Sequence, residues 1–406
     1  CVMYSGEAVE TGRIEDVFDK MQHPYTQALF RSIPLPGADK NDRPLVAIPG
    51  NFPLPHERPV GCNFGPRCDY FKAGRCDQGP ISMDTVPHGD RHGSRCLKWS
   101  EIDWDAPLEL AEQKVKAEPG RVVLNIKNLK KYYEVAANAL FGGGTKKVVK
   151  ANETLSFEAR ESETLAIVGE SGCGKSSCGR SILRLVEPTS GDIFLDGKNI
   201  ISLNGRELRS ARRDMQMVFQ DPYASLNPYM RLREQIAEPL KNFGLATRSE
   251  VDDIVRDILE KVELPVSFLR RFPHELSGGQ RQRVAIARAI VVNPSLVITD
   301  EAVSALDVSV QAQVLNLMMS LQDELGLSYL FISHDMAVVE RVSHKVGVMY
   351  LGRLVEVGSR SQIFENPQHE YTRTLMAAVP IADPKKRNIS RSTSLLKTAL
   401  MYGIPE

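Results

Sequence analysis

The chain has 406 residues, and its 51 basic residues are balanced by 51 acidic ones, so composition gives no electrostatic case for nucleic-acid binding. It contains no apolar run of 18 residues or more and no signal-peptide pattern, which predicts that any work at a membrane requires partner proteins.

The first 36 residues are repeated near the other end of the chain. Residues 1–36 align without a gap to 347–382, and both copies share Val-Met-Tyr, Val-Glu-x-Gly, a phenylalanine and Gln-His-x-Tyr-Thr. The last motif is Gln22-His-Pro-Tyr-Thr26 in the first copy and Gln368-His-Glu-Tyr-Thr372 in the second. Such a repeat indicates the end of one module followed by a whole second module.

The segment 37–118 has a different composition. Eight prolines fall between positions 34 and 66, which predicts an irregular connection. Four cysteines follow, Cys62, Cys68, Cys76 and Cys96, and their crowding favours metal ligation over disulfides. Their spacing does not match the paired CxxC of a zinc ribbon, whereas four thiolates suit an iron–sulfur cluster by count. Another metal and unligated thiols remain alternatives.

A phosphate-binding loop is predicted after the apolar run Leu165–Val168, and residues 177–185 can continue it as a helix. Glycines let backbone amides converge on phosphate oxygens, and the helix N-terminus adds positive potential. Lys175 is expected to reach the outer phosphates, and the Ser176 hydroxyl to ligate Mg²⁺. The predicted nucleotide-binding residues here are Gly169, Glu170, Ser171, Gly172, Cys173, Gly174, Lys175, Ser176 and Ser177.

Polar residues end three predicted strands downstream. They are Gln220, the pair Asp300 and Glu301, and His334. Because parallel strands present their carboxyl ends to the ligand crevice, we expect Asp300 to hold Mg²⁺ through water and Glu301 to act as general base. His334 is expected to contact the γ-phosphate. Gln220 is expected to sense Mg²⁺ and the γ-phosphate.

Helical periodicity appears twice between these strands. Thr247-Arg-Ser-Glu250 predicts a capping box, and the following apolar positions lie at helical spacing: Val251, Ile254, Val255, Ile258, Leu259 and Val262. We expect this stripe to face the core of a helical lobe, with a partner-docking face as the alternative. A second amphipathic helix follows Asp307. The alternation of helix and strand predicts a parallel α/β core.

Across about 121–380 the chain resembles the ABC ATPase family. The motifs that carry the resemblance are Gly169–Ser176, Gln220, Leu276-Ser-Gly-Gly-Gln280, Asp300-Glu301, Ser304-Ala-Leu-Asp307 and His334. The resemblance implies a P-loop NTPase core with a parallel sheet, an antiparallel β subdomain and a helical signature subdomain. It implies ATP and Mg²⁺ as ligands, with Ser176, Gln220 and Asp300 at the metal and Glu301, His334 and Gln220 as catalytic residues.

In that family two cassettes pair head to tail. The signature Ser277, Gly278, Gly279 and Gln280 would then act in trans, on ATP held by the partner's P-loop, and Ser304, Ala305, Leu306 and Asp307 would form the D-loop. The resemblance also implies that Tyr133 stacks on adenine, with Tyr132 as the alternative. Ala302 replaces the family's usual proline, so a looser turn is expected there.

The Gln-His-x-Tyr-Thr tail resembles the C-terminal extension of ATP-binding proteins of oligopeptide, dipeptide and nickel importers. The similarity covers 121–384, with 1–100 matching the tail of the first half of a fused double cassette, and tails that share Gly61–Cys68 are associated with a [4Fe-4S] cluster. It implies four segments: 1–36, the end of a first cassette; 37–118, a Pro-rich and Cys-containing tail and linker; 119–384, a complete cassette; and 385–406, a tail.

The implied function is ATP-driven uptake of a dipeptide, an oligopeptide or glutathione at the cytoplasmic face of the inner membrane. Two membrane permeases, a periplasmic or extracellular solute-binding protein and a second cassette would be the partners, and no nucleic acid is expected. Nickel-chelate import and a soluble, non-transport ABC ATPase remain alternatives. The sequence does not identify the substrate.

Overall fold

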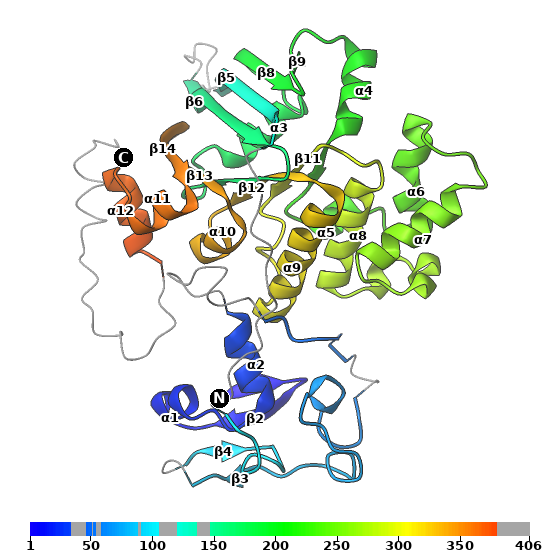
Figure 1. Ribbon diagram of the computed structural model, residues 1–406, viewed down its shortest axis with the longest axis vertical. Coiled ribbons are helices and arrows are strands. Elements are labelled where there is room, and N and C mark those ends of the chain that lie inside the picture. Colours follow the sequence, from blue (N-terminus) through cyan, green and yellow to red (C-terminus); the bar gives the residue numbers. More distant parts are fainter. Residues whose placement is uncertain are drawn as a thin grey trace, which may run out of the picture. The chain divides into compact units, whose positions relative to one another are not determined.

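The computed structural model describes residues 1–33, 46–50, 52–53, 58–87, 91–104, 120–135 and 147–379. The chain divides into two compact units (Figure 1). One comprises Cys1–Gln113, Val308–Gln313 and Pro380–Glu406, and the other comprises Lys114–Asp307 and Val314–Val379. The predicted tail 385–406 and the glycines at 142–144 lie outside the described residues.

The first unit is built on a small antiparallel sheet. Its order is β1 (Val2–Tyr4), β2 (Glu7–Thr11), β4 (Gly93–Ser94) and β3 (Asp84–Thr85), accompanied by α1 (Ile14–Asp19), α2 (Pro24–Ser32) and the 3-10 turn η2 (Gly65–Arg67). Tyr4, Val9, Ile48 and Phe64 form its buried apolar cluster. The repeated N-terminal segment and the cysteine segment therefore share one core.

A six-stranded sheet forms the centre of the second unit. Its order is β10 (Met215–Val218), β11 (Leu296–Asp300), β12 (Ser328–Ser333), β7 (Thr164–Val168), β13 (Lys345–Tyr350) and β14 (Arg353–Ser359). The first five strands are parallel, and β14 is antiparallel to β13. Every residue of β7, β11 and β12 is buried, as expected for a parallel sheet covered on both faces. The predicted parallel α/β core is confirmed.

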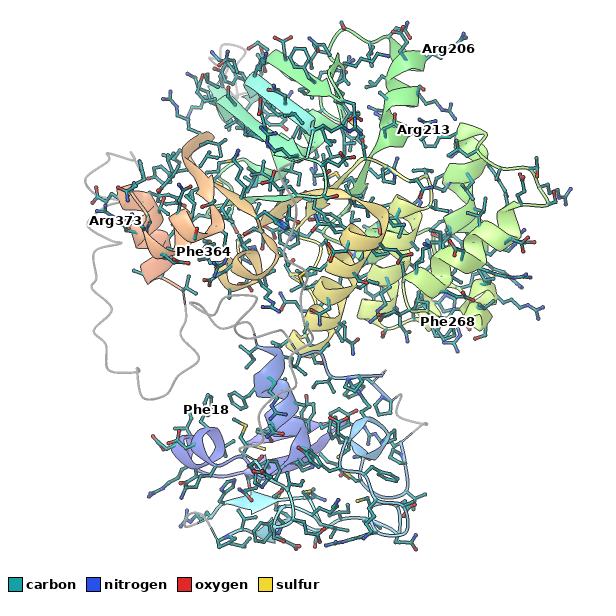
Figure 2. The ribbon with its side chains drawn as sticks, in the orientation of Figure 1. Phe18, Arg206, Arg213, Phe268, Phe364 and Arg373 are labelled. Carbon is teal, nitrogen blue, oxygen red and sulfur yellow. The ribbon has the colours of Figure 1, made fainter. Side chains whose placement is uncertain are left out.

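Helices flank this sheet, and a second sheet stands beside it. The helices are α3 (Lys175–Ile182), α9 (Val308–Leu325), α10 (Met336–Val342), α11 (Arg360–Glu365) and α12 (Glu370–Ala377). The second sheet is antiparallel, in the order β6 (Lys147–Arg160), β5 (Val122–Val135), β8 (Ser190–Leu195) and β9 (Lys198–Asn199). Helix α4 (Gly205–Asp214) follows it, and its Arg206 and Arg213 are exposed (Figure 2).

A helical lobe completes the second unit. It consists of α5 (Pro222–Ser225), α6 (Leu232–Phe243), α7 (Val251–Lys261), η3 (Val266–Arg270), η4 (Pro273–Glu275) and α8 (Gly278–Ile290). The apolar stripe of α7 faces the interior, since Val255, Ile258 and Leu259 are buried. The predicted capping box forms in part. Glu250 accepts from Thr247 N at 2.8 Å, as a capping box requires, but Thr247 Oγ1 donates to the same carboxylate, and the helix begins only at Val251.

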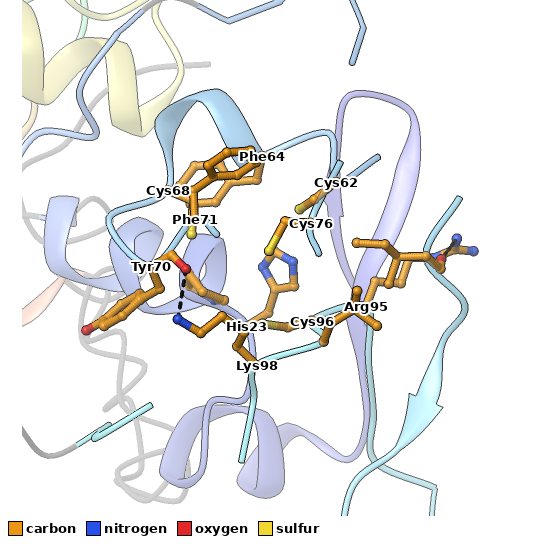
Figure 3. A pocket seen from close by; sticks show the side chains of 14 residues that line it. His23, Cys62, Phe64, Cys68, Tyr70, Phe71, Cys76, Arg95, Cys96 and Lys98 are labelled. Atoms are coloured by element: carbon orange, nitrogen blue, oxygen red, sulfur yellow. Dashed lines mark hydrogen bonds between the residues drawn. The ribbon is translucent and has the colours of Figure 1, made fainter. Parts of the chain in front are cut away.

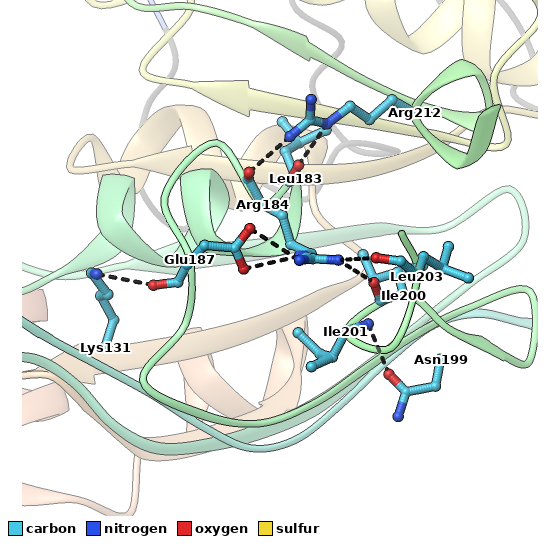
Figure 4. A network of polar contacts seen from close by, with 9 residues as sticks. All are labelled: Lys131, Leu183, Arg184, Glu187, Asn199, Ile200, Ile201, Leu203 and Arg212. Carbon is cyan, nitrogen blue, oxygen red and sulfur yellow. Dashed lines mark hydrogen bonds and ion pairs between the residues drawn. The ribbon is translucent and has the colours of Figure 1, made fainter. Parts of the chain in front are cut away.

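Two arginines hold the C-terminal end of α3 (Figure 4). Arg184 donates to the Ile200 and Leu203 carbonyls and pairs with Glu187, while Arg212 donates to the carbonyls of Leu183 and Arg184. Carbonyls at a helix end have no partner within the helix, so Arg212 satisfies those that follow α3, while Arg184 ties the helix end to the loop of Ile200 and Leu203. This anchoring fixes the helix that carries the predicted phosphate-binding lysine.

Candidate nucleotide-binding site

The phosphate-binding loop lies between the buried strand β7 and helix α3. Its lysine is turned onto the loop, since Lys175 Nζ donates to the carbonyls of Gly169 at 2.7 Å and Glu170 at 2.9 Å. Lys175 is only 3% exposed, so these carbonyls replace the water that the charge would otherwise bind. A nucleotide phosphate placed here would offer the ammonium group a stronger, anionic partner.

Glycine is required where the loop passes closest to its neighbours. Gly174 has φ 109°, and a Cβ there would lie 2.0 Å from the Ala151 carbonyl oxygen. Gly169 has φ 152°, and its Cβ would lie 2.2 Å from the Met349 carbonyl oxygen. Only glycine combines this backbone conformation with so close an approach. The loop therefore packs closely against the backbone of β6 on one side and the end of β13 on the other.

Two of the three residues predicted at Mg²⁺, Ser176 and Asp300, meet at the start of α3, whereas Gln220 bonds to Glu301. Ser176 Oγ donates to Asp300 Oδ1 at 2.7 Å. Burial raises the pKa of Asp300 above its ordinary value, although the bond from Ser176 opposes this. A carboxylate that lacks water beside a hydroxyl is a donor set that suits Mg²⁺, because the cation would restore the lost solvation.

The three predicted catalytic residues converge on one carboxylate. Gln220 Nε2 donates to Glu301 Oε2 at 3.0 Å, and His334 Nδ1 lies 3.1 Å from Glu301 Oε1. They come from the ends of adjacent strands, since β10 and β12 flank β11 on either side. Glu301 has φ 50°, a strained conformation of the kind found at functional sites. Its carboxylate lies at the carboxyl ends of the parallel strands, where the sequence predicts the ligand crevice.

The turn after Glu301 closes without the expected proline. Ser304 N and Ser304 Oγ both donate to the Glu301 carbonyl, at 3.1 and 2.9 Å, and Ala302 is 3% exposed. Ser304, Ala305 and Asp307 are exposed, and Leu306 is half-buried. The residues predicted for the D-loop thus form a short surface turn beside the catalytic carboxylate.

The signature opens helix α8. Ser277 is its N-cap, and Ser277 and Gln280 form a reciprocal capping box with bonds of 3.3 and 3.1 Å. Gly278 is half-buried, and a Cβ there would meet no atom closer than 3.7 Å, on Leu306. The sequence Ser-Gly-Gly-Gln therefore presents the N-terminus of a 13-residue helix, where backbone amides and the helix dipole attract anions.

The two tyrosines predicted as alternatives for the adenine point to different partners. Tyr133 Oη lies 3.4 Å from Ser177 Oγ, beside the phosphate-binding loop. Tyr132 Oη instead donates to Glu153 Oε1 at 2.7 Å. Of the two, Tyr133 is the one that contacts the phosphate-binding loop, and its stacking on adenine stays a prediction.

The four clustered cysteines line one small cavity of about 20 Å³ in the first unit, together with the buried His23 (Figure 3). Burial raises the pKa of Cys68 to about 12 and that of Cys96 to about 11, so both thiols are protonated at neutral pH. In the part of the chain that is described, no three His, Cys, Asp or Glu side chains are placed to hold a metal ion. The thiols share a cavity, but the geometry does not define a single-ion site.

Two contacts to the phosphate-binding loop had no counterpart in the sequence analysis. Asn152 Nδ2 donates to the Gly174 carbonyl at 3.0 Å, and Tyr371 Oη accepts from Glu170 N at 3.2 Å. Asn152 is a fully buried amide in a strand, a position that asparagine usually avoids. The sequence feature that could have pointed to Tyr371 is the repeated Gln-His-x-Tyr-Thr motif, which contains it.

None of the helices in the described ranges has the length and apolar character needed to span a bilayer. Residues 152–304 match the family model described as ABC transporter, and residues 9–76 and 355–399 match the oligopeptide/dipeptide transporter C-terminal region. The second model thus matches both copies of the repeat.

Curated relatives extend the similarity over nearly the whole chain. A glutathione import ATP-binding protein of Pectobacterium atrosepticum is 44% identical over 386 residues, which are 95% of this chain and 54% of the relative. The protein of the same name from Salmonella paratyphi A is 44% identical over 390 residues, 96% of this chain and 54% of its own length. The chain spans about half the length of the curated relatives it matches.

Solved structures match the second unit's architecture. cbiO1 from Clostridium perfringens, part of an ABC transporter complex, has a TM-score of 0.52 and 26% identity, covering 60% of this chain and 91% of that one. The ATP-binding cassette MJ0796, solved as a dimer in a post-hydrolysis state with ADP and Pi, has a TM-score of 0.52 and 28% identity, covering 58% and 98%.

Proposed function

Because the chain belongs to the ATP-binding proteins of ABC transporters, in the oligopeptide and dipeptide importer family, we propose that it hydrolyses ATP to energise uptake of a peptide. Dipeptides, oligopeptides and glutathione are the candidate substrates. The similarity to glutathione import ATP-binding proteins makes glutathione the first to test.

The single observation that carries the proposal is the convergence on Glu301. Its two carboxylate oxygens contact Gln220 and His334, and Asp300, which bonds to Ser176 of α3, is the residue just before it at the end of β11. When Mg²⁺ is bound, it would neutralise phosphate charge. Glu301 would accept a proton from the attacking water, and His334 and Gln220 would orient that water and the carboxylate.

A second cassette is expected to complete the site. The Ser277–Gln280 cap lies at the N-terminus of α8, where Ser277 is exposed and Gly278 and Gln280 are half-buried. Two copies arranged head to tail would place this helix N-terminus against the partner's nucleotide. Support comes from the dimeric form in which the similar cassette MJ0796 binds ADP and Pi.

A permease would dock in a groove of about 610 Å³ between α4, β10, α6 and α8. Met217 and Phe219, just before Gln220, line it together with Leu185 and Phe243 on the other elements. Phe219 and Leu185 are 38% and 49% exposed, an unusual state for large apolar side chains on facing walls. A short amphipathic helix of one permease would occupy this groove, and the second cassette would bind the other permease. This would place the chain peripherally at the inner face of the membrane, with a solute-binding protein outside.

The four thiols are proposed as ligands of an iron–sulfur cluster. The support is that Cys62, Cys68, Cys76 and Cys96 line one cavity. Iron would have to stabilise the thiolate form that burial disfavours at Cys68 and Cys96. Anaerobic incubation with iron and sulfide should give visible absorption and bound iron that replacement of Cys68 by serine abolishes. Cys1→Ser, at an exposed position, is the matched control.

The hydrolysis proposal is tested by Glu301→Gln. We expect ATP turnover to fall by about 10²–10⁴-fold, the usual effect of losing a general base, while ATP binding persists. Unchanged turnover would contradict the assignment. Co-purification of the tagged parent protein from gently solubilised membranes tests transport: two permeases and a solute-binding protein should appear, whereas ribosomes or DNA complexes alone would overturn it.

A further inference from the structure

We propose that Tyr371 is a positioning residue of the nucleotide site, through which the C-terminal extension fixes the backbone of the phosphate-binding loop. Its hydroxyl oxygen accepts a hydrogen bond from Glu170 N at 3.2 Å. Tyr371 lies in α12, and Glu170 is the second residue of the loop, 201 positions earlier in the chain.

Glu170 is held on both of its backbone polar groups. Its N–H donates to Tyr371, while its carbonyl accepts from Lys175 Nζ at 2.9 Å and from Cys173 N at 3.3 Å. A shift of this residue would therefore move the carbonyl that positions the lysine and the turn that begins the phosphate cradle. The hydrogen bond from Glu170 to Tyr371 therefore restrains the residue whose carbonyl holds both Lys175 and Cys173.

The repeated motif explains how the tyrosine is aimed. Glu356 accepts from Gln368 N at 2.7 Å and from His369 N at 3.0 Å, and His369 Nδ1 accepts from Tyr371 N at 3.1 Å as the cap of α12. The Tyr371 ring packs on Tyr350, with centroids 4.2 Å apart. The His369 ring and the Tyr371 hydroxyl thus each have a defined task in presenting this hydroxyl to the loop, and Gln368 contributes its backbone amide.

The same end of the chain holds the loop at a second point. Gly352 N donates to the Cys173 carbonyl at 2.9 Å, from the turn that joins β13 and β14. One bond therefore restrains the loop near its start and the other near its middle. If either bond is lost, the backbone amides that would contact a phosphate are less well ordered before binding. The entropy lost when they become ordered on binding then weakens the observed affinity.

The size of the effect follows from the chemistry of one neutral hydrogen bond. Such bonds change an equilibrium by roughly 2- to 10-fold when a partner is removed. Tyr371→Phe deletes only the oxygen that accepts from Glu170, and it keeps the ring that packs on Tyr350. Tyr350→Phe removes a hydroxyl from the same ring pair and leaves the bond to Glu170 intact, so it is the matched control.

The experiment is a titration of the 406-residue chain with a fluorescent ATP analogue and Mg²⁺, together with thermal unfolding without nucleotide. We expect Tyr371→Phe to bind the analogue about 3- to 10-fold more weakly, with Tyr350→Phe equal to wild type and all three unfolding at the same temperature. Equal affinity of the three proteins would overturn the inference. So would weaker binding by Tyr371→Phe that is matched by Tyr350→Phe or accompanied by an equal loss of nucleotide-free stability.

The inference rests on ATP binding at this loop, and the two can fail separately. If wild type does not bind the analogue, both the inference and the proposed function are wrong. If wild type and Glu301→Gln bind it equally and Tyr371→Phe matches them, ATP binding stands and the tyrosine has no positioning role.

Discussion

The two copies of the repeat, residues 2–32 and 348–378, make the same local structure with different surroundings. Each folds as a β-hairpin followed by two short helices, β1, β2, α1 and α2 in the first and β13, β14, α11 and α12 in the second. In both, a histidine side chain caps the last helix by accepting from a tyrosine amide, at 3.1 Å in each case. In both, a glutamate side chain accepts a hydrogen bond from the backbone N–H of the glutamine, at 2.7 Å.

Their surroundings differ completely. In the first copy Glu10 is fully buried and also pairs with His92 Nε2 at 2.8 Å, and His23 is 1% exposed. In the second copy Glu356 is half-buried and His369 is exposed. The comparison teaches that the motif encodes a local scaffold, and that the scaffold serves a buried core in one unit and a nucleotide loop in the other.

The largest difference should appear when the shared glutamate is removed. Glu10→Ala leaves His92 and the Gln22 amide without a buried partner, so we expect a loss of about 3–5 kcal/mol in unfolding free energy of the first unit. Glu356→Ala frees amides that water can reach, and should cost about 1 kcal/mol. Urea unfolding can be followed by tryptophan fluorescence for Glu10→Ala, because Trp99 and Trp104 both lie in the first unit, and by circular dichroism for Glu356→Ala. Equal losses would break the comparison.

A smaller difference is expected at the capping histidine. His23→Ala should destabilise the first unit by about 2–3 kcal/mol, because a cap worth about 1 kcal/mol is lost together with buried packing. His369→Ala should cost only about 0.5–1 kcal/mol in the second unit, since that ring is exposed. The same two unfolding signals measure both. A cost at His369 as large as that at His23 would show that the ring's surroundings do not matter.

Lowering the pH should reduce the unfolding free energy of the first unit by an amount similar to, or slightly smaller than, the effect of His23→Ala. Burial lowers the pKa of His23 to about 3 from 6.5, so the unfolded chain binds this proton more readily and the stability conferred by the neutral ring is lost as pH falls below about 6.5. Between pH 7.5 and pH 5 the first unit should lose about 2 kcal/mol from this group. His23→Ala should remove that part of the pH dependence in the tryptophan signal, and an unchanged slope would contradict it.

Most of the fold and much of the candidate site could be predicted from local patterns. The strand predicted at Leu165–Val168 is Thr164–Val168, and the strand that ends in Asp300 and Glu301 is Leu296–Asp300. These predictions succeed because a buried parallel strand is a short, continuous apolar run with no polar interruption. The capping box at Thr247 is only half made, because the Thr247 hydroxyl bonds to the Glu250 carboxylate in a turn that precedes the helix, while the Thr247 amide makes the predicted bond to Glu250.

The sequence by itself determined the candidate residues for nucleotide chemistry, their order and the existence of a repeated local scaffold, because each depends on spacings of a few residues. Only the tertiary structure decided that Gln220 and His334 meet on Glu301, since strand order in the sheet brings together residues that are far apart in the chain. It also decided that one copy of the scaffold pairs with His92 while the other presents Tyr371 to Glu170. A hydrogen bond within a turn is fixed by chain geometry, whereas a partner 201 residues away is chosen by the packing of the whole domain.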